Sequence, residues 1–235
     1  MTLAAWKRFL RVSGNNRQPA EHDIASLISR IDAARFARIR NQYAAADPYP
    51  GYSKYLDLEL WMARAIERAK SLNIQGRKPS RILDIGAGSV YFPFVCAQSG
   101  HSVMALDRQE PRMYVDLADL LAVPRISHTI KALEPLPEME GRFDLITAFS
   151  ICFNGHNTPQ LWDVDEWTFF LRDLATNFAH DETQIHLVFN QEPSGEFFSA
   201  ALQKLFASYG GSCESDTVRL TAGFVRTASR LSGPT

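Results

Sequence analysis

The sequence predicts an α/β fold, doubly wound around a mostly parallel sheet that closes with an antiparallel hairpin. From Arg81 onward, short apolar runs alternate with longer helical patterns, which is typical of βαβ units. A glycine-rich turn, Gly86-Ala87-Gly88, joins the first apolar run to a helix. Two further β-rich runs, separated by a short turn, lie near the end of the chain and indicate the hairpin.

The chain before Arg81 carries helical patterns. Apolar residues at helical spacing predict one helix from about Asp23 to Tyr43 and a second from about Tyr55 to Leu72. Between them, the segment Asp47-Pro48-Tyr49-Pro50-Gly51 interrupts the pattern. We therefore expect two parts, an N-terminal helical cap over residues 1–78 and a core over residues 79–235.

Seven strands are predicted in the core. Five apolar runs predict the parallel strands: Arg81–Ile85, Ser102–Leu106, Ile126–Ile130, Phe143–Ala148 and Ile185–Asn190. The hairpin is predicted from Ser212–Leu220 and Phe224–Ala228, joined by a Thr221-Ala222-Gly223 turn. Helices are predicted at Tyr91–Ser99, Arg112–Val123, Val164–Ala179 (with Asp163 as N-cap) and Glu196–Tyr209.

Composition limits the class of protein. The 235 residues carry 25 Lys and Arg against 26 Asp and Glu, so the formal net charge of -1 gives no general attraction to nucleic acid. Three widely spaced cysteines, Cys96, Cys152 and Cys213, fit neither a disulfide framework nor a zinc site. No apolar run approaches the ~18 residues of a spanning helix. We expect a cytoplasmic protein without a membrane span, although residues 1–11 fit a short helix that is docked on the protein or lies on a membrane surface.

The glycine turn and the acid after the second strand predict a nucleoside site. Gly86 permits a tight turn out of the strand, and Gly88 lets a ligand approach the backbone. Asp107 comes nineteen positions after Gly88, where the second strand ends. Its carboxylate could accept hydrogen bonds from both hydroxyls of a ribose. The alternative is that the glycines only make the turn and Asp107 caps a helix.

A dinucleotide fits this turn less well. The dinucleotide fingerprint has a third glycine, and Tyr91 stands at that position here. Asp84, two residues before Gly86, would repel a pyrophosphate but suits a cationic ligand.

At these residues the chain resembles the class I S-adenosylmethionine-dependent methyltransferases. Their first motif stands here as Asp84-Ile-Gly86-Ala-Gly88-Ser-Val90, and Asp107 matches their acid after the second strand. Their fourth strand is present as Phe143-Asp144-Leu145-Ile146. The resemblance covers about Tyr55 to Ala228 and implies a Rossmann-like core that binds S-adenosyl-L-methionine and releases S-adenosyl-L-homocysteine. Val90 departs from the family's third glycine.

The resemblance implies a set of cofactor-binding residues around the turn. Where the family often has an acid after the third strand, this chain has Glu134 or none, so Ala132 and Leu133 are the candidates beside the adenine. Aromatic faces near the sulfonium would attract its charge. The candidates are Asp84, Gly86, Ala87, Gly88, Tyr91, Asp107, Arg108, Ala132, Leu133 and Phe149.

Substrate-facing groups are expected after the fourth and fifth strands and in the cap. His156 is the candidate general base, because its ordinary pKa suits proton transfer near neutrality, and Asn154 is a candidate for orienting the substrate. The candidate substrate-binding residues are Tyr52, Tyr55, Phe153, Asn190 and Glu192. Each could instead serve packing, a turn or a cap. We find no signature of a metal site.

The sequence therefore predicts a methyltransferase acting on oxygen or nitrogen of a small molecule. Methylation of RNA or DNA is less favoured, because no basic stripe is found. Two alternatives stay open: an oxidoreductase that uses a nicotinamide dinucleotide, and a catalytically silent protein that binds the cofactor or acts as a scaffold. The sequence does not indicate an oligomeric state.

Overall fold

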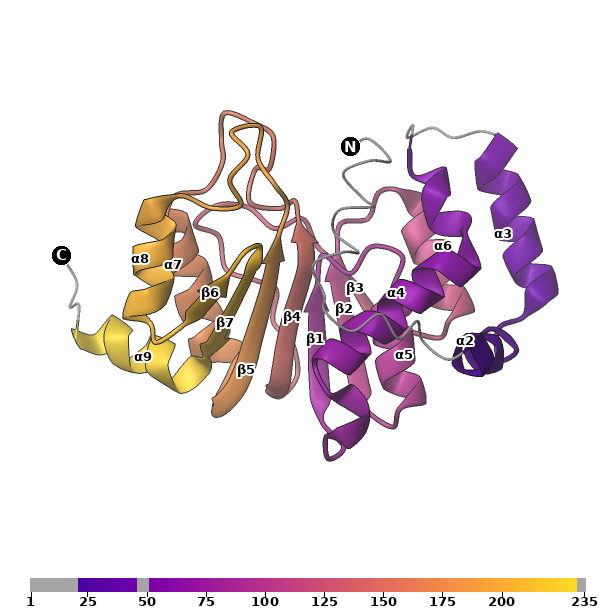
Figure 1. The fold of residues 1–235 in the computed structure, drawn as a ribbon, viewed down its shortest axis with the longest axis horizontal. Helices are drawn as coiled ribbons and strands as arrows, with labels where there is room; N and C mark the ends of the chain where they lie inside the picture. The colour runs from indigo at the N-terminus through magenta and orange to yellow at the C-terminus, as the bar shows by residue number, and fades with distance from the viewer. Residues whose placement is uncertain (1–20, 46–50, 232–235) are drawn as a thin grey trace.

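A seven-stranded sheet in the order β3-β2-β1-β4-β5-β7-β6 forms the centre of the molecule (Figure 1). The computed structural model describes residues 21–45 and 51–231. The parallel strands are β1 (Arg81–Ile85), β2 (Ser102–Asp107), β3 (Arg125–Ser127), β4 (Phe143–Ile151) and β5 (Ala179–Phe189). β7 (Thr217–Thr221) runs antiparallel to both β5 and β6 (Ser212–Glu214). The predicted fold class is confirmed: a doubly wound, Rossmann-like, mostly parallel sheet with a C-terminal hairpin and N-terminal helices.

Both faces of the sheet are buried under helices. Side chains alternate along β1, so that Ile82 faces one hydrophobic cluster and Leu83 the other. The Ile82 side packs against α4 (Leu58–Ser71), α5 (Tyr91–Gln98) and α6 (Arg112–Leu120). The Leu83 side packs against α7 (Val164–Asp173), α8 (Ala200–Ser208) and α9 (Ala222–Leu231).

The N-terminal region contains more breaks than predicted. The single helix predicted from Asp23 is wrong: α2 (Glu21–Ile28) and α3 (Ala33–Ala45) are separate, and Asp32 Oδ1 accepts a hydrogen bond from the Arg35 amide at 2.8 Å to begin α3. The helix predicted from Tyr55 begins later, because Asp57 caps α4 and a short 3₁₀ turn, η1 (Ser53–Leu56), precedes it. The predicted terminal helix of residues 1–11 and Tyr49 lie outside the described residues.

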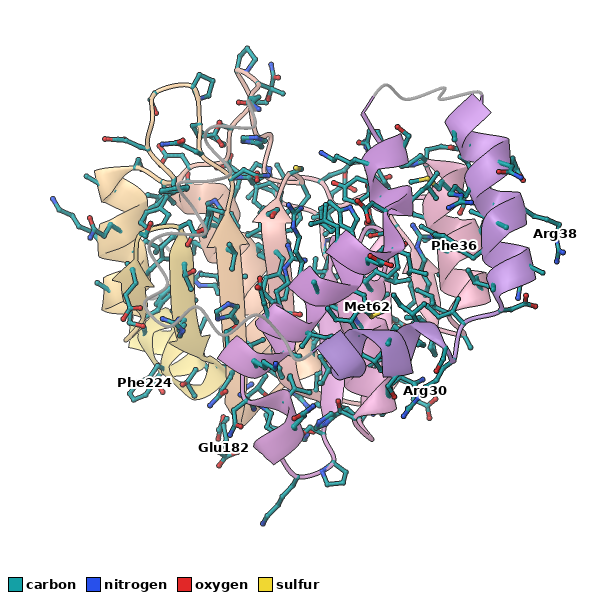
Figure 2. The ribbon with its side chains drawn as sticks, turned by 45° about the vertical axis from the view of Figure 1, so that its right-hand side comes forward. Arg30, Phe36, Arg38, Met62, Glu182 and Phe224 are labelled. Carbon is teal, nitrogen blue, oxygen red and sulfur yellow. The ribbon has the colours of Figure 1, made fainter. Side chains whose placement is uncertain are left out.

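The helices before β1 pack directly on the core. Met62 of α4 is fully buried and points inward, whereas Arg38 of α3 points to solvent (Figure 2). Met62 belongs to the same hydrophobic cluster as Ile82 of β1 and Phe94 of α5. The division at residue 78 therefore stays a prediction.

Three predicted parallel strands and two predicted helices have different bounds in the structure. β5 begins at Ala179 instead of Ile185, and the last turn of the helix predicted to reach Ala179 is a π-helical segment, η3 (Leu174–Phe178). The start of β5 is polar and exposed (Asp181, Glu182), which hid the strand pattern. β4 continues to Ile151, and β3 ends early at Ser127. The helix expected from Glu196 begins at Ala200, where Ser199 caps it.

The hairpin exists, but its strands were predicted wrongly. β6 and β7 are joined by a tight turn at Ser215 and Asp216, and Ser215 adopts a φ of 53°. The segment predicted as the second strand, Phe224–Ala228, lies in helix α9. Its side chains follow a helical period: Val225 is buried, whereas Phe224 is 62% exposed and projects into solvent (Figure 2).

The order of strands reverses beside β1. The chain winds outward from β1 through β2 to β3 and then returns to β4 on the other side of β1. In open α/β sheets, such a reversal leaves a crevice outside the carboxyl ends of the two central strands, and ligands bind there. The fold therefore places the candidate site at the ends of β1 and β4.

Candidate active site

The turn after β1 is held against β2. Gly86 (φ 69°) and Gly88 (φ 54°) occupy the left-handed region that favours glycine. The Gly86 amide donates to the Leu106 carbonyl at 2.7 Å. A Cβ added at Gly86 would meet only Phe153, at an ordinary 3.8 Å, so Gly86 is required for its backbone conformation and not for lack of space. The turn thus leaves backbone exposed at the mouth of the crevice.

Val90 takes the place of the third glycine of the motif and is itself left-handed. Its φ is 54° and its side chain is fully buried, a strained conformation for a β-branched residue. Tyr91 follows, also buried, and its hydroxyl donates to the Tyr55 carbonyl at 2.8 Å. Burial raises the pKa of Tyr91. Tyr91 thus fastens η1 to α5, and its contact with a cofactor stays a prediction.

Asp107 reaches from the end of β2 to the glycine turn. Its Oδ2 accepts a hydrogen bond from the Gly88 amide at 2.6 Å, and its Oδ1 accepts one from the Arg108 amide at 2.7 Å. Burial raises the pKa of Asp107, while these two hydrogen bonds and the nearby Arg125 act in the opposite direction. Each carboxylate oxygen keeps acceptor capacity beyond the bond it makes. The carboxylate is therefore fixed at the turn, and its remaining lone pairs can accept further hydrogen bonds.

Asp84 is inside the protein. It is 4% exposed, and its Oδ1 accepts a hydrogen bond from the Thr147 hydroxyl at 2.6 Å. Burial raises the pKa of Asp84 to about 7, so its charge is weakened at neutral pH. Whether Asp84 attracts a cationic ligand, as the sequence predicted, is not tested by these contacts.

Tyrosines from two elements gather beside Gly88. The ring of Tyr114, on α6, lies 5.7 Å from that of Tyr52 and 5.6 Å from that of Tyr55 between centroids. A Cβ at Gly88 would be 3.7 Å from the Tyr114 ring. Tyr52 accepts a hydrogen bond at its hydroxyl from Arg108 Nη2 at 2.8 Å. The 3₁₀ turn of the cap is thus joined to the end of β2, and sequence reasoning missed Tyr114.

The two candidate phenylalanines lie in different surroundings. Phe149 packs edge-on against Phe92 at 4.9 Å, and the Arg68 guanidinium lies over its ring at 4.5 Å. Phe153 joins an aromatic cluster with Trp162, Trp167 and Phe170. The Arg68 guanidinium therefore already lies over the Phe149 ring, where the sequence predicted a sulfonium. A contact between Phe149 and the cofactor remains a prediction.

The loops after β4 and β5 rise side by side above the sheet (Figure 1) and are joined by His156 and Glu192. His156 Nδ1 lies 2.8 Å from Glu192 Oε1, and both side chains are largely buried. The other oxygen of Glu192 accepts a hydrogen bond from the Asn157 amide at 3.1 Å. His156 Nε2 lies 2.8 Å from Asn157 Nδ2. The carboxylate thus favours a proton on Nδ1, which leaves Nε2 as the acceptor.

The two candidate asparagines contact the protein backbone. Asn154 is 3% exposed; its carbonyl accepts from the Trp162 amide at 2.8 Å, and its side-chain Oδ1 has no hydrogen-bond partner among the described residues. Asn190 Nδ2 donates to the carbonyls of Ser150 and Ile151 at 3.0 and 3.1 Å. Asn190 thus holds the end of β4, and a substrate contact for either residue stays a prediction.

Ala132 and Leu133 lie beyond the end of β3 and are exposed. Leu133 is left-handed (φ 59°) and 54% exposed. Glu134 pairs with Lys131 at 3.3 Å on the surface. Among the described residues, no hydrogen bond or ion pair joins Ala132 or Leu133 to the glycine turn, and their place at the adenine remains a prediction.

Cys152 lies between the two halves of the site. Burial raises the pKa of its thiol, and Arg108, Asp107 and Glu192 are among the charges that act on it. Those charges come from residues at or beyond the ends of β2 and β5, so Cys152 is near both Asp107 and the His156–Glu192 pair. Sequence reasoning missed Cys152 and Arg68.

The described residues contain no cluster of three or more His, Cys, Asp or Glu side chains that could hold a metal ion. Within the same residues, no helix combines the length and apolarity needed to cross a membrane.

Comparison with known proteins finds similarity only among solved structures. No protein-family model and no curated protein matches the chain. Magnesium protoporphyrin IX methyltransferase from Synechocystis PCC 6803, solved with bound S-adenosylmethionine, aligns at 13% identity over 79% of this chain and 95% of its own, with a TM-score of 0.48. An amino pentose methyltransferase from Micromonospora echinaspora, also solved with the cofactor, aligns at 18% identity over 57% of this chain and 53% of its own (0.44).

A ribosomal protein L11 methylase from Lactobacillus delbrueckii subsp. bulgaricus aligns at 17% identity over 68% of this chain and 74% of its own, with a TM-score of 0.42. All three similar structures are methyltransferases. The chain spans about half the length of the amino pentose enzyme. Because these similarities are distant, the function of this chain has to be argued from its own site.

Proposed function

We propose that this protein is an S-adenosylmethionine-dependent methyltransferase whose acceptor is an oxygen or nitrogen atom of a small molecule. The observation that carries the proposal is the Asp107 carboxylate, bound to the Gly88 amide at 2.6 Å across the turn that opens the crevice. A carboxylate fixed there can accept hydrogen bonds from both ribose hydroxyls of an adenosyl group. The reversal of strand order beside β1 supports the same place.

The residues of the turn fit a nucleoside without a pyrophosphate. A bound pyrophosphate needs backbone amides that are free at the helix start. Here the Gly88 amide is already engaged by Asp107, and the buried Tyr91 stands where a dinucleotide site has its third glycine. The oxidoreductase alternative therefore gains no support from the site.

When bound, S-adenosylmethionine supplies a methyl group on a positively charged sulfur. The chain has to orient the acceptor in line with that methyl group, exclude water and remove the acceptor's proton. We assign the last role to His156 Nε2. Glu192 holds the imidazole by Nδ1, and Asn157 has to release Nε2 before it can accept the proton. Tyr52 and Tyr55 cover the ribose side of the crevice.

A small acceptor is favoured by access to the base. The His156 side chain is 14% exposed, which suits a small nucleophile better than a macromolecular surface. The near balance of charge also supports this reading over nucleic acid.

Two experiments test the proposal. Calorimetric titration of S-adenosylhomocysteine against NADH should show binding of the first and not of the second. Methyl-labelled S-adenosylmethionine incubated with the protein and a metabolite extract should label a small molecule, and His156→Ala should abolish that labelling while leaving cofactor affinity unchanged. Binding of NADH alone would refute the proposal. Binding of S-adenosylhomocysteine with no transfer in any extract would favour a silent cofactor-binding protein.

A further inference from the structure

The carboxyl end of β4 contains a bulge. Phe149 is paired with Val188 of β5, and the next paired residues are Ile151 and Phe189. Ser150 is therefore an extra residue in β4 that has no counterpart in β5. Its φ of 54° lies in the left-handed region that glycine adopts most easily. Bulges are rare between parallel strands, and beside active sites they redirect a side chain.

The bulge changes which side chain of β4 faces the core. Ala148 and Ile151 both belong to the hydrophobic cluster on the Leu83 side of the sheet, although they are three positions apart. In a strand that alternates strictly, Ser150 would share that face with Ala148, and Ile151 would lie on the other face. The extra residue instead turns Ile151 into the core and leaves Ser150 exposed at the end of the strand.

Asn190, at the end of β5, holds the bulge in place. Its Nδ2 donates to the carbonyls of Ser150 and Ile151, and it also lies 3.2 Å from the Cys152 sulfur. One side chain thus satisfies two carbonyls of the bulge. The left-handed conformation of Ser150 is therefore maintained by its surroundings, as is typical of strained residues at functional sites.

The hydroxyl of Ser150 has no role inside the described part of the chain. The Ser150 carbonyl accepts hydrogen bonds from Asn190 and from the Cys152 thiol, but the hydroxyl makes no hydrogen bond to another described residue. Glycine would adopt the same φ without the strain that a Cβ brings. An exposed hydroxyl kept at a position that favours glycine therefore indicates a ligand that binds it.

The bulge lies near both the ribose carboxylate and the proposed base. The Cys152 thiol is 3.4 Å from the Ser150 carbonyl, to which it donates. The charges of Asp107 and Glu192 both act on this thiol. Glu192 in turn holds His156. A small molecule that reaches His156 from the cofactor side therefore meets the end of β4.

We propose that the Ser150 hydroxyl binds the methyl acceptor and orients its nucleophilic atom toward the cofactor. The inference rests on the proposed function and adds a residue that recognises the acceptor. A hydroxyl can both donate and accept a hydrogen bond, so it can hold a polar group of the acceptor while His156 removes the proton from the nucleophilic atom. Loss of this hydroxyl should therefore weaken the acceptor and spare the cofactor.

The test removes the hydroxyl in two ways. Ser150→Gly also relieves the left-handed backbone, whereas Ser150→Ala does not. Each protein is incubated with methyl-labelled S-adenosylmethionine and a dilution series of a metabolite extract, and the amount of extract that gives half of the maximal labelling rate is measured. Because one hydrogen bond to the acceptor is lost, we expect both variants to need about 3- to 10-fold more extract. Calorimetric affinity for S-adenosylhomocysteine should stay within about twofold of the wild type.

Ser215→Gly is the matched control. Ser215 is an exposed, left-handed serine in the turn between β6 and β7, with a φ of 53°. The same change there relieves the same backbone conformation, and the extract requirement should not change. Thermal unfolding of all three variants checks that they fold, and Ser150→Gly should be at least as stable as the wild type.

Each result decides the matter. An unchanged extract requirement in both Ser150 variants would overturn the inference. So would an effect of Ser150→Gly that Ser150→Ala does not share, because the backbone and not the hydroxyl would then be responsible. An equal loss of S-adenosylhomocysteine affinity would show that Ser150 serves the cofactor instead. If the wild-type chain labels nothing in the extract, the proposed function fails and this inference fails with it, an outcome distinct from the others.

Discussion

Asp107→Asn is the substitution that most directly probes the ribose site. It keeps the shape of the side chain and one acceptor oxygen, which can still receive the Gly88 amide now 2.6 Å from Oδ2. It removes the negative charge and replaces the other oxygen by a donor. Because the turn can keep its hydrogen bond, we expect the fold to survive and the effect to fall on the ligand.

The expected magnitude follows from the hydrogen bonds that the change affects. One of the two carboxylate oxygens loses its acceptor role and the other loses its charge. Hydrogen bonds to charged groups contribute about 1.5–3 kcal/mol each. Loss equivalent to one such bond predicts that S-adenosylhomocysteine binds about 10- to 150-fold more weakly to Asp107→Asn.

Calorimetric titration of S-adenosylhomocysteine measures this difference, with thermal unfolding of the free protein as the check on folding. Asp144→Asn is the matched control: Asp144 is an exposed carboxylate near the opposite end of β4, where it accepts a hydrogen bond from the Arg81 amide. We expect the control to bind as the wild type does. Unchanged affinity in Asp107→Asn would show that Asp107 does not bind the ribose.

Three further predictions follow from the site. Because burial raises the pKa of Asp84 to about 7, the folded chain holds this proton more tightly than the unfolded chain; the resulting stability is present below about pH 4 and is lost as the pH rises to 7. Denaturant unfolding at pH 4 and pH 7 measures this loss of stability, which should be on the order of 4 kcal/mol in the wild type and absent in Asp84→Asn. The same pH dependence in the wild type and in Asp84→Asn would contradict this prediction. Gly86→Ala should lower the free energy of unfolding by about 1–2 kcal/mol, because its φ of 69° disfavours a Cβ; an unchanged midpoint would count against this backbone strain. Glu192→Gln should weaken the preference of His156 for a proton on Nδ1, read from the ring ¹⁵N shifts, and an unaltered spectrum would show that Glu192 does not set the tautomer.

The fold was largely predictable from local patterns. β1, the glycine turn and Asp107 were found because apolar strand residues and glycines at turns are local signals. The second strand of the hairpin was predicted wrongly because Phe224 and Val225 favour strands and the run is too short to show a helical period. The start of β5 was missed because its polar residues lie at the exposed end of the sheet.

The partners within the site were not predictable. Glu192 and His156 are 36 positions apart, and Arg68 meets Phe149 from another element, so only the fold brings them together. The sequence predicted Glu192 as a substrate-binding residue without a partner. In the structure its carboxylate contacts both the His156 ring and the Asn157 amide. Arg68 was not singled out, because the sequence does not show that this side chain of α4 meets the Phe149 ring.

The proposed function requires an adenosyl ligand to lie across the turn after β1 with its ribose on Asp107. A crystal structure of the protein with S-adenosylhomocysteine tests it most directly. We predict both ribose hydroxyls within about 3 Å of the Asp107 carboxylate oxygens and the thioether sulfur above Gly86. A ligand bound elsewhere, or a crevice filled by the protein's own side chains at saturating ligand, would contradict the claim.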